Sequence, residues 1–158
     1  MRLICLFWVL YLSSLVAAFS QDVLRGDVAR IIDGDTVDII VNSVLVRVRL
    51  AEIDTPEKDQ AWGYEASKAL EGKILGKTVR VVITDIDRYG RKVGKIFVNG
   101  NNINWEMVEE GHAWVYRDYS DNEKLIDLED KARIDKVSLW SMESPKPPWE
   151  WRRQQRGN

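Results

Sequence analysis

The first half of the chain carries the alternation of apolar and polar residues that is typical of β-strands. Two apolar rows flank Asn42-Ser43, at Val37, Ile39 and Val41 and then at Val44, Val46, Val48 and Leu50. Two such rows joined by two turn-forming residues predict a hairpin. Arg47 and Arg49 occupy alternate positions in the second row, so we expect both arginines on the face opposite the apolar side chains.

Later segments show both helical and strand patterns. Apolar residues recur every four positions from about Tyr64 to Leu75, which predicts a helix that ends before Gly76. Strands are predicted at 79–83 and 93–98, a short helix at about 103–110, and a longer helix at about 122–137 with Asp121 as its N-cap. Five strands with a helix after the third predict an α+β, mainly β, fold in which helices pack beside a small Greek-key barrel.

The two ends of the chain differ from this central part. Residues 1–20 have a positive start, an apolar stretch and then small residues, which is the pattern of a secretory signal peptide. Cleavage predicts a secreted or periplasmic protein, and an uncleaved segment would instead anchor it to the membrane. Residues 142–158 are rich in proline, tryptophan and arginine. We expect the prolines to prevent a helix there, and the tail to be either a loose solubilising end or a contact to phosphates or a membrane surface.

Composition indicates one globular domain, which the patterns place at residues 21–141. The chain has 158 residues, of which 45% are hydrophobic and 30% charged. Cys5 is the only cysteine and lies in the signal-like segment, so the mature protein would have neither a disulfide nor a zinc–thiolate site. The formal net charge of −2 is mildly against a nucleic-acid partner. We expect a monomer with no stable protein partner.

Three polar clusters interrupt the strand pattern. They are Asp33-Gly34-Asp35-Thr36, Asp54-Thr55-Pro56-Glu57 and Asp87-Arg88-Tyr89-Gly90-Arg91. Each cluster alone is explained by an ordinary turn or a solvated loop. The first two place four carboxylates near the ends of neighbouring strands, where they would repel one another unless a cation lay among them. Carboxylate oxygens suit calcium or magnesium rather than zinc.

Two arginines accompany these acids. Arg49 and Arg91 come from strands that a small barrel can bring to the same end. A hard cation and paired guanidinium groups neutralise the charge that develops on phosphorus, while a free carboxylate activates water. The set therefore predicts phosphodiester hydrolysis.

The same segments resemble the thermonuclease, or staphylococcal nuclease-like, family. The matching pieces are Ile32-Asp-Gly-Asp-Thr-Val37, Val48-Arg-Leu-Ala-Glu-Ile-Asp-Thr-Pro-Glu57, Asp87-Arg-Tyr-Gly-Arg91 and Asn104 to Gly111 followed by His-Ala-Trp-Val-Tyr116. The resemblance runs in unbroken order from about Val23 to Ser141. It implies a five-stranded OB barrel with three helices. It also implies calcium-dependent cleavage of DNA and RNA by attack of water on phosphorus, which leaves 3′-phosphate ends.

The resemblance further implies a calcium site. Asp35 and Asp54 match side-chain ligands of the ion, and Thr55 matches a ligand through its backbone carbonyl. Asp33 matches an acid close to the ion, less certainly a ligand.

It implies a catalytic set as well. Glu57 matches the general base, or the residue that orders the attacking water, and Arg49 and Arg91 match the two phosphate-binding arginines. The chain departs from the family in one respect. Only residues 58–62 separate Glu57 from Gly63, where the best-known member has a longer, lysine-rich loop, so the resemblance does not fix substrate affinity.

Several aromatic residues and one histidine stand near these motifs. Tyr89, Tyr116 and Tyr119 are candidates for base or sugar contact, with packing as the alternative. His112 is the only histidine, and we interpret it as structural because Glu57 already fills the role of base. Tryptophans 62, 105, 114 and 140 are expected to pack in the core or at its edge.

Two other classes of function are compatible with a small barrel. A catalytically silent copy would only hold nucleic acid or a protein partner, but such copies typically lose the acids and arginines that this chain keeps. A secreted adhesion or structural domain would leave the acid–arginine set without a purpose. The sequence therefore favours the nuclease over both.

Overall fold

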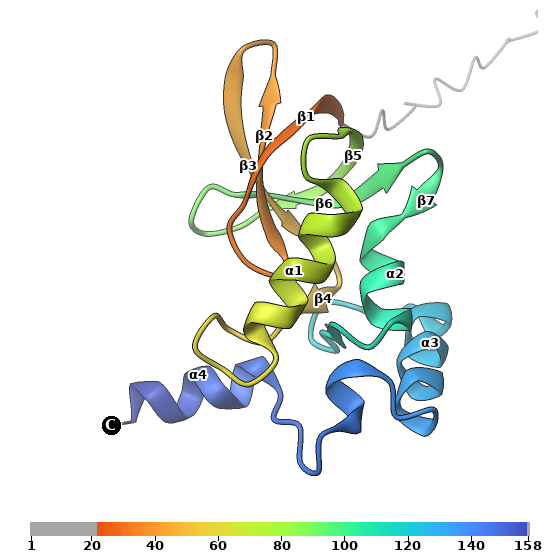
Figure 1. The fold of residues 1–158 in the computed structure, drawn as a ribbon. Helices are drawn as coiled ribbons and strands as arrows, with labels where there is room; N and C mark the ends of the chain where they lie inside the picture. Colours follow the sequence, from red (N-terminus) through yellow and green to blue (C-terminus); the bar gives the residue numbers. More distant parts are fainter. Residues whose placement is uncertain (1–21, 158) are drawn as a thin grey trace, which may run out of the picture.

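The computed structural model describes residues 22–157. Figure 1 shows a barrel of strands at one end of this part of the chain and helices gathered below it. The signal-like segment at residues 1–20, with its predicted cleavage or membrane anchoring, lies outside the described residues. Within them, no helix is both long enough and apolar enough to cross a membrane.

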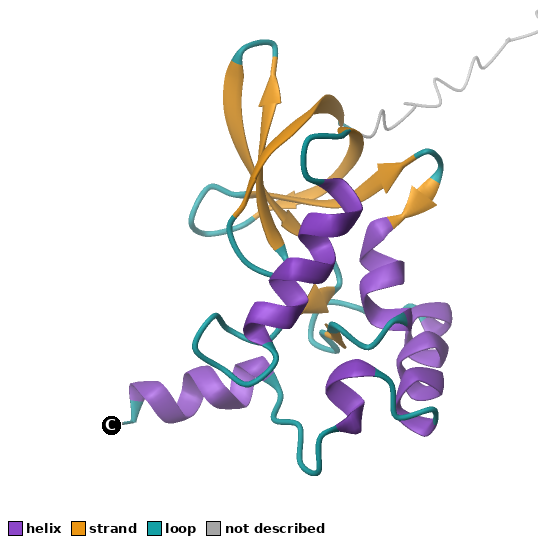
Figure 2. Ribbon diagram, in the orientation of Figure 1, coloured by secondary structure: helices purple, strands orange, loops and turns teal. Residues whose placement is uncertain are grey.

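Five long strands form the barrel. They are β1 (Val23–Ile31), β2 (Thr36–Val41), β3 (Val44–Leu50), β5 (Thr78–Ile86) and β6 (Lys92–Val98). Their order is β3-β2-β1-β5-β6, and a parallel pairing of β3 with β6 closes the sheet on itself. Helix α1 (Gly63–Ile74) is inserted between β3 and β5 and, in Figure 2, runs downward from the level of β6. This arrangement confirms the predicted OB barrel.

The tight turn between β2 and β3 forms where the sequence predicts it. Asn42 and Ser43 have φ angles of 49° and 67°, as both central residues of a two-residue hairpin turn require. Val48 is fully buried, whereas its neighbours Arg47 and Arg49 are not. The prediction that both arginines lie opposite the apolar row is confirmed.

The two helices after the barrel also lie close to their predicted positions. The hairpin strand β7 (Asn101–Asn102) leads into α2 (Ile103–Glu109), and α3 (Glu123–Ile134) follows. The N-cap of α3 is Asn122 rather than the predicted Asp121, because the Asn122 Oδ1 accepts a hydrogen bond from the Leu125 N–H at 3.3 Å. Asparagine and aspartate cap helices equally well, so local sequence does not choose between adjacent positions.

The C-terminal tail contains a fourth helix, α4 (Pro148–Arg156), which follows a 3₁₀ turn, η1 (Ser138–Ser141). The three helices predicted beside the barrel are present as α1, α2 and α3, and α4 adds a fourth. The prediction of a non-helical tail was wrong. Pro148 occupies the first helical turn, where no backbone N–H is needed, so it begins the helix instead of preventing it. Trp149 stacks on Tyr116, with ring centroids 5.5 Å apart and planes within 4°. The tail is thus docked on the domain.

The core has two parts. The larger part fills the barrel and continues between α1, α2 and α3. The smaller part is built on Trp114 and Trp140, which are 6% and 8% exposed, and Trp62 and Trp149 pack against it. Trp105 packs against the larger part, so the prediction that these tryptophans serve packing is confirmed.

Two short strands connect the barrel to the helical layer. β4 (Ile53–Asp54) pairs with β8 (Trp114–Val115), which places Asp54 opposite Trp114. The carboxylate of Glu129 on α3 is fully buried, and its Oε1 accepts a hydrogen bond from the Val115 N–H at 2.8 Å. Helix α3 therefore holds β8, and β8 holds the strand that carries Asp54.

Candidate active site

The loop between β1 and β2 positions Asp35. The Asp33 carboxylate accepts a hydrogen bond from the Asp35 N–H at 3.1 Å and so stabilises the turn. Asp35 is 7% exposed, and its carboxylate accepts hydrogen bonds from the Thr36 Oγ1 at 3.0 Å and from the Thr55 N–H at 3.2 Å. A Cβ at Gly34 would lie only 2.6 Å from the Thr55 Oγ1. The first two polar clusters therefore meet in direct contact.

Arg49 joins the two buried aspartates of this site. Its Nη2 lies 3.0 Å from the Asp54 Oδ1 and 3.4 Å from the Asp35 Oδ2. The Asp54 side chain is 2% exposed and that of Arg49 16%, so water screens these charges little. The strands bring this arginine and the two acids to one end of the barrel, as the sequence predicts.

Negative charge is concentrated here. Burial raises the pKa of Asp54, hydrogen bonds from Arg152 lower it and the charge of Asp35 raises it again, which leaves a pKa of about 6. Burial, and then the neighbouring Asp35, also raise the pKa of Asp33 to about 6. Burial works against the charge of Arg49, but Asp35 and Asp54 outweigh it and raise the pKa of the guanidinium. The cluster of acids therefore favours further positive charge.

Glu57 lies beside these acids on a compact turn. Its N–H donates to the Gln60 Oε1 at 3.1 Å, and its carbonyl accepts a hydrogen bond from the Gln60 N–H at 2.9 Å. The Glu57 side chain is 36% exposed, so water reaches its carboxylate, while hydrogen bonds to Gln60 hold both the N–H and the carbonyl of the Glu57 main chain. That combination suits a general base.

Gly63, the first residue of α1, sets the position of this turn. A Cβ at Gly63 would overlap the carbonyl oxygen of Glu57. We expect Gly63→Ala to displace Glu57 and to slow nucleic-acid cleavage by about tenfold or more, on the scale at which small misplacements of catalytic groups act. The cleavage rate should be compared with that of Gly72→Ala on the same helix, where a Cβ meets nothing within 4 Å. Equal rates in the two variants would contradict this role of Gly63.

The structure adds an arginine that the sequence motifs did not identify. Arg152 on α4 donates from Nη2 to the Asp54 Oδ2 at 2.7 Å and from Nη1 to the Glu57 Oε1 at 2.7 Å. Although burial works against its charge, hydrogen bonds to these two carboxylates raise the pKa of Arg152. The one signal in the sequence was the basic character of the tail, which named no partner.

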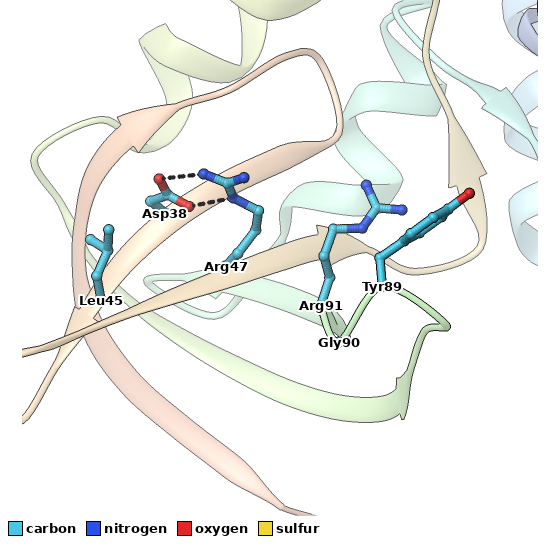
Figure 3. A pocket seen from close by; sticks show the side chains of 6 residues that line it. All are labelled: Asp38, Leu45, Arg47, Tyr89, Gly90 and Arg91. Carbon is cyan, nitrogen blue, oxygen red and sulfur yellow. Dashed lines mark hydrogen bonds and ion pairs between the residues drawn. The ribbon is translucent and has the colours of Figure 1, made fainter.

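Arg91 lies to one side of this group, in a pocket of about 630 Å³. Figure 3 shows the lining residues Asp38, Leu45, Arg47, Tyr89, Gly90 and Arg91. The Arg91 Nε donates to the Asp87 Oδ2 at 2.6 Å, and no hydrogen bond or ion pair within residues 22–157 joins Arg91 to Asp35, Asp54 or Glu57. The parallel pairing of β3 with β6 does make the strands of Arg49 and Arg91 neighbours. The predicted proximity thus holds for the strands, while the Arg91 side chain faces its own loop.

The remaining candidates divide between packing and exposure. His112 accepts a hydrogen bond from the Trp62 Nε1 at 3.2 Å, and burial lowers the pKa of its imidazole. A neutral histidine held by an indole fits the structural role that we predicted. Tyr116 is covered by Trp149 and packs against Tyr119, whereas Tyr89 is 70% exposed at the pocket. Of the three tyrosines, Tyr89 combines exposure with a place in the pocket.

Comparison with known proteins identifies the domain. Residues 47–142, more than half of the chain, match the model of the family described as staphylococcal nuclease homologue. The chain belongs to the staphylococcal nuclease family. The match ends at residue 142, so α4 lies outside the residues that match the family.

Similar curated proteins match a larger share of the chain of this staphylococcal nuclease homologue than the family model does. It is 44% identical over 142 residues to "Protein ParB" of Escherichia coli, which covers 83% of this chain and 80% of that protein. It is 41% identical over 140 residues to "Micrococcal nuclease" of Shigella flexneri, with 82% and 80% covered. It is 40% identical over 147 residues to an "Uncharacterized endonuclease" of Escherichia coli O157:H7, with 90% and 96% covered.

The site of this staphylococcal nuclease homologue can be compared with what a calcium ion needs. In the part of the chain that the structure describes, no three acidic, histidine or cysteine side chains are grouped closely enough to hold a metal ion. Asp35 and Asp54 are bridged by Arg49, and Thr55 contributes its N–H. The chemistry of the donors nevertheless fits a hard cation, because Asp35 and Asp54 offer buried carboxylate oxygens, which are the ligands that calcium prefers.

Proposed function

We propose that the protein is a nuclease that hydrolyses phosphodiester bonds in DNA and RNA with calcium and leaves 3′-phosphate ends. The observation that carries this proposal is the buried pair Asp35 and Asp54, which share Arg49. Arg152 in turn joins Asp54 to the water-accessible Glu57. The relatives named micrococcal nuclease and endonuclease support the class of reaction. The Asp35–Asp54 pair would hold the ion together with the carbonyl of Thr55 and water.

The residues of the site divide the reaction among them. When bound, calcium would supply electrophilic stabilisation of the charge on the phosphate. Glu57 orients a water molecule and takes its proton while the water oxygen bonds to phosphorus. The bond to the 5′-oxygen breaks, and this oxygen takes a proton from solvent and leaves as the 5′-hydroxyl. Arg49 donates hydrogen bonds to the non-bridging oxygens, where charge accumulates, and Arg91 would do the same once it turns from Asp87 to the phosphate. Tyr89, exposed beside Arg91, is placed to contact a sugar or base next to the cleaved bond.

We also infer that the protein acts outside the cytoplasm and as a monomer. The support for export is the signal-like pattern of residues 1–20. Its substrates would then be nucleic acids that reach the secreted or periplasmic enzyme.

Calcium dependence provides the test of this function. We expect purified protein to degrade plasmid DNA and RNA in calcium and to stop when a chelator is added, because the acids then lose the ion. New DNA ends should be extended by a polymerase only after phosphatase treatment, as 3′-phosphates require. A folded Asp54→Asn variant, checked by circular dichroism, is the inactive control. Substrate that stays intact at every calcium concentration would refute the proposal, and binding without cleavage would favour a nucleic-acid-binding module.

A further inference from the structure

The C-terminal strap, which we define as residues 145–157, places a guanidinium group directly on the acids of the site. Arg152 Nη2 donates to the Asp54 Oδ2 at 2.7 Å, and its Nη1 donates both to the Asp54 Oδ1 at 3.2 Å and to the Glu57 Oε1 at 2.7 Å. This is the two-pronged geometry of a strong arginine–carboxylate pair. In the proposed function, Asp54 binds calcium and Glu57 takes the proton of the attacking water.

The strap is anchored by contacts that do not involve the acids. The ring of Trp149 stacks on Tyr116 and meets Trp114 edge-on, with centroids 5.7 Å apart. The Gln60 Nε2 donates to the carbonyl of Lys146 at 2.6 Å, which connects the strap to the turn that carries Glu57. In Figure 1, α4 lies beside the loop that precedes α1. The docked helix α4 therefore fixes the position of Arg152 beside the acids.

A divalent ion on Asp54 would have to displace Arg152, which, unlike Arg49, engages both oxygens of this carboxylate. Both oxygens of Asp54 accept hydrogen bonds from Arg152, and Oδ1 also accepts one from Arg49. An ion bound to Asp54 would lie within a few ångströms of the guanidinium, where like charges repel strongly in a buried setting. Charge balance also favours the exchange. In the closed form, in which Arg152 contacts the acids, three carboxylates face two guanidinium groups and one negative charge is left over. A divalent ion in place of Arg152 would neutralise that charge.

We propose that the strap is an intramolecular inhibitor in which Arg152 occupies the calcium position and engages the general base, so that the enzyme loads calcium only when α4 releases Arg152. This inference rests on the proposed function, because it assigns calcium to Asp54. Closed molecules do not bind the ion, so the apparent dissociation constant for calcium equals the intrinsic one divided by the fraction of molecules that are open.

Calcium binding by isothermal titration calorimetry, without substrate, tests this inference on the full chain. We expect Arg152→Met to bind calcium about tenfold more tightly than the unaltered protein, as releasing a strap that is closed in nine molecules out of ten would give. Trp149→Ala should shift the affinity in the same direction while leaving every charge in place, because it weakens the anchor alone. Arg153→Met, at the exposed neighbouring position, removes the same charge and should change the affinity by less than about twofold.

The outcomes separate this inference from the function on which it rests. Calcium that binds equally to the unaltered protein, Arg152→Met and Trp149→Ala would overturn the strap and leave the nuclease standing. Absence of calcium binding in all of them would overturn both. Unchanged calcium affinity with a large loss of cleavage in Arg152→Met would make Arg152 a substrate contact, which also overturns inhibition.

Hydrogen exchange provides a second readout that does not depend on activity. Calcium should speed the exchange of amides in residues 148–156 of the unaltered protein, because binding releases α4. In Asp54→Asn, which should not bind the ion, calcium should leave this exchange unchanged. Calcium that binds without speeding exchange in α4 would show that the strap stays docked and would refute the proposal.

Discussion

Glu57→Gln is expected to slow the cleavage of DNA by about a hundredfold or more at saturating calcium, the scale on which general bases contribute. The glutamine keeps the size of the side chain but cannot take a proton from water. The backbone of the turn should be unaffected, since Gln60 holds it through main-chain groups of residue 57. Single-turnover cleavage of a labelled duplex measures the chemical step directly.

The matched control for this variant is Glu65→Gln, which makes the same chemical change at an exposed position of α1. It should cleave at the rate of the unaltered protein. Glu57→Gln also removes one of the two carboxylates that hold Arg152, which would loosen the strap and favour activity. A loss of rate therefore cannot come from tighter inhibition. A rate within about threefold of the unaltered protein would show that Glu57 is not the base.

Glu129→Ala is expected to lower the free energy of unfolding by about 3–5 kcal/mol, the usual cost of breaking a buried ion pair by removing one partner. The Glu129 Oε1 accepts a hydrogen bond from the Val115 N–H, and Oε2 lies 2.7 Å from the Arg117 Nη2 and 3.2 Å from the Arg133 Nη2. Alanine would leave all three donors without this acceptor. Urea unfolding followed by tryptophan fluorescence measures the loss.

Two companion variants test the reason for this loss. Glu129→Gln keeps an oxygen for the Val115 N–H and should cost less than Glu129→Ala, because the main-chain bond survives. Asp130→Ala changes the exposed next residue of α3 and should alter stability by no more than about 0.5 kcal/mol. A Glu129→Ala protein as stable as Asp130→Ala would show that the buried carboxylate does not hold β8 in place.

The buried Glu129 also bears on the active site. It fixes Val115, and Val115 pairs with Ile53 in the ladder that carries Asp54. A site residue on a strand of two residues needs this support, because β4 alone has too few hydrogen bonds to hold its position. The helical layer therefore positions an acid of the candidate site that the barrel presents.

Local pattern was sufficient for the barrel and for most of its acid cluster. Period-two alternation set which face of β3 is buried, and the turn-forming pair Asn42-Ser43 set the register of the hairpin. Arg49 and Asp54 then meet because the strand that carries one leads within a few residues to the other. These features follow from side-chain alternation and turn chemistry over short stretches of the chain.

The tertiary structure decided what local pattern could not. Arg152 meets Asp54 across 98 residues, and no periodicity in the tail names that partner. Pro148 begins a helix in a segment that tryptophan stacking docks on the domain, and Arg91 pairs with Asp87 of its own loop rather than with the acids of the site. The partners of a long-range ion pair are set by tertiary packing, which depends on the whole fold and not on local sequence.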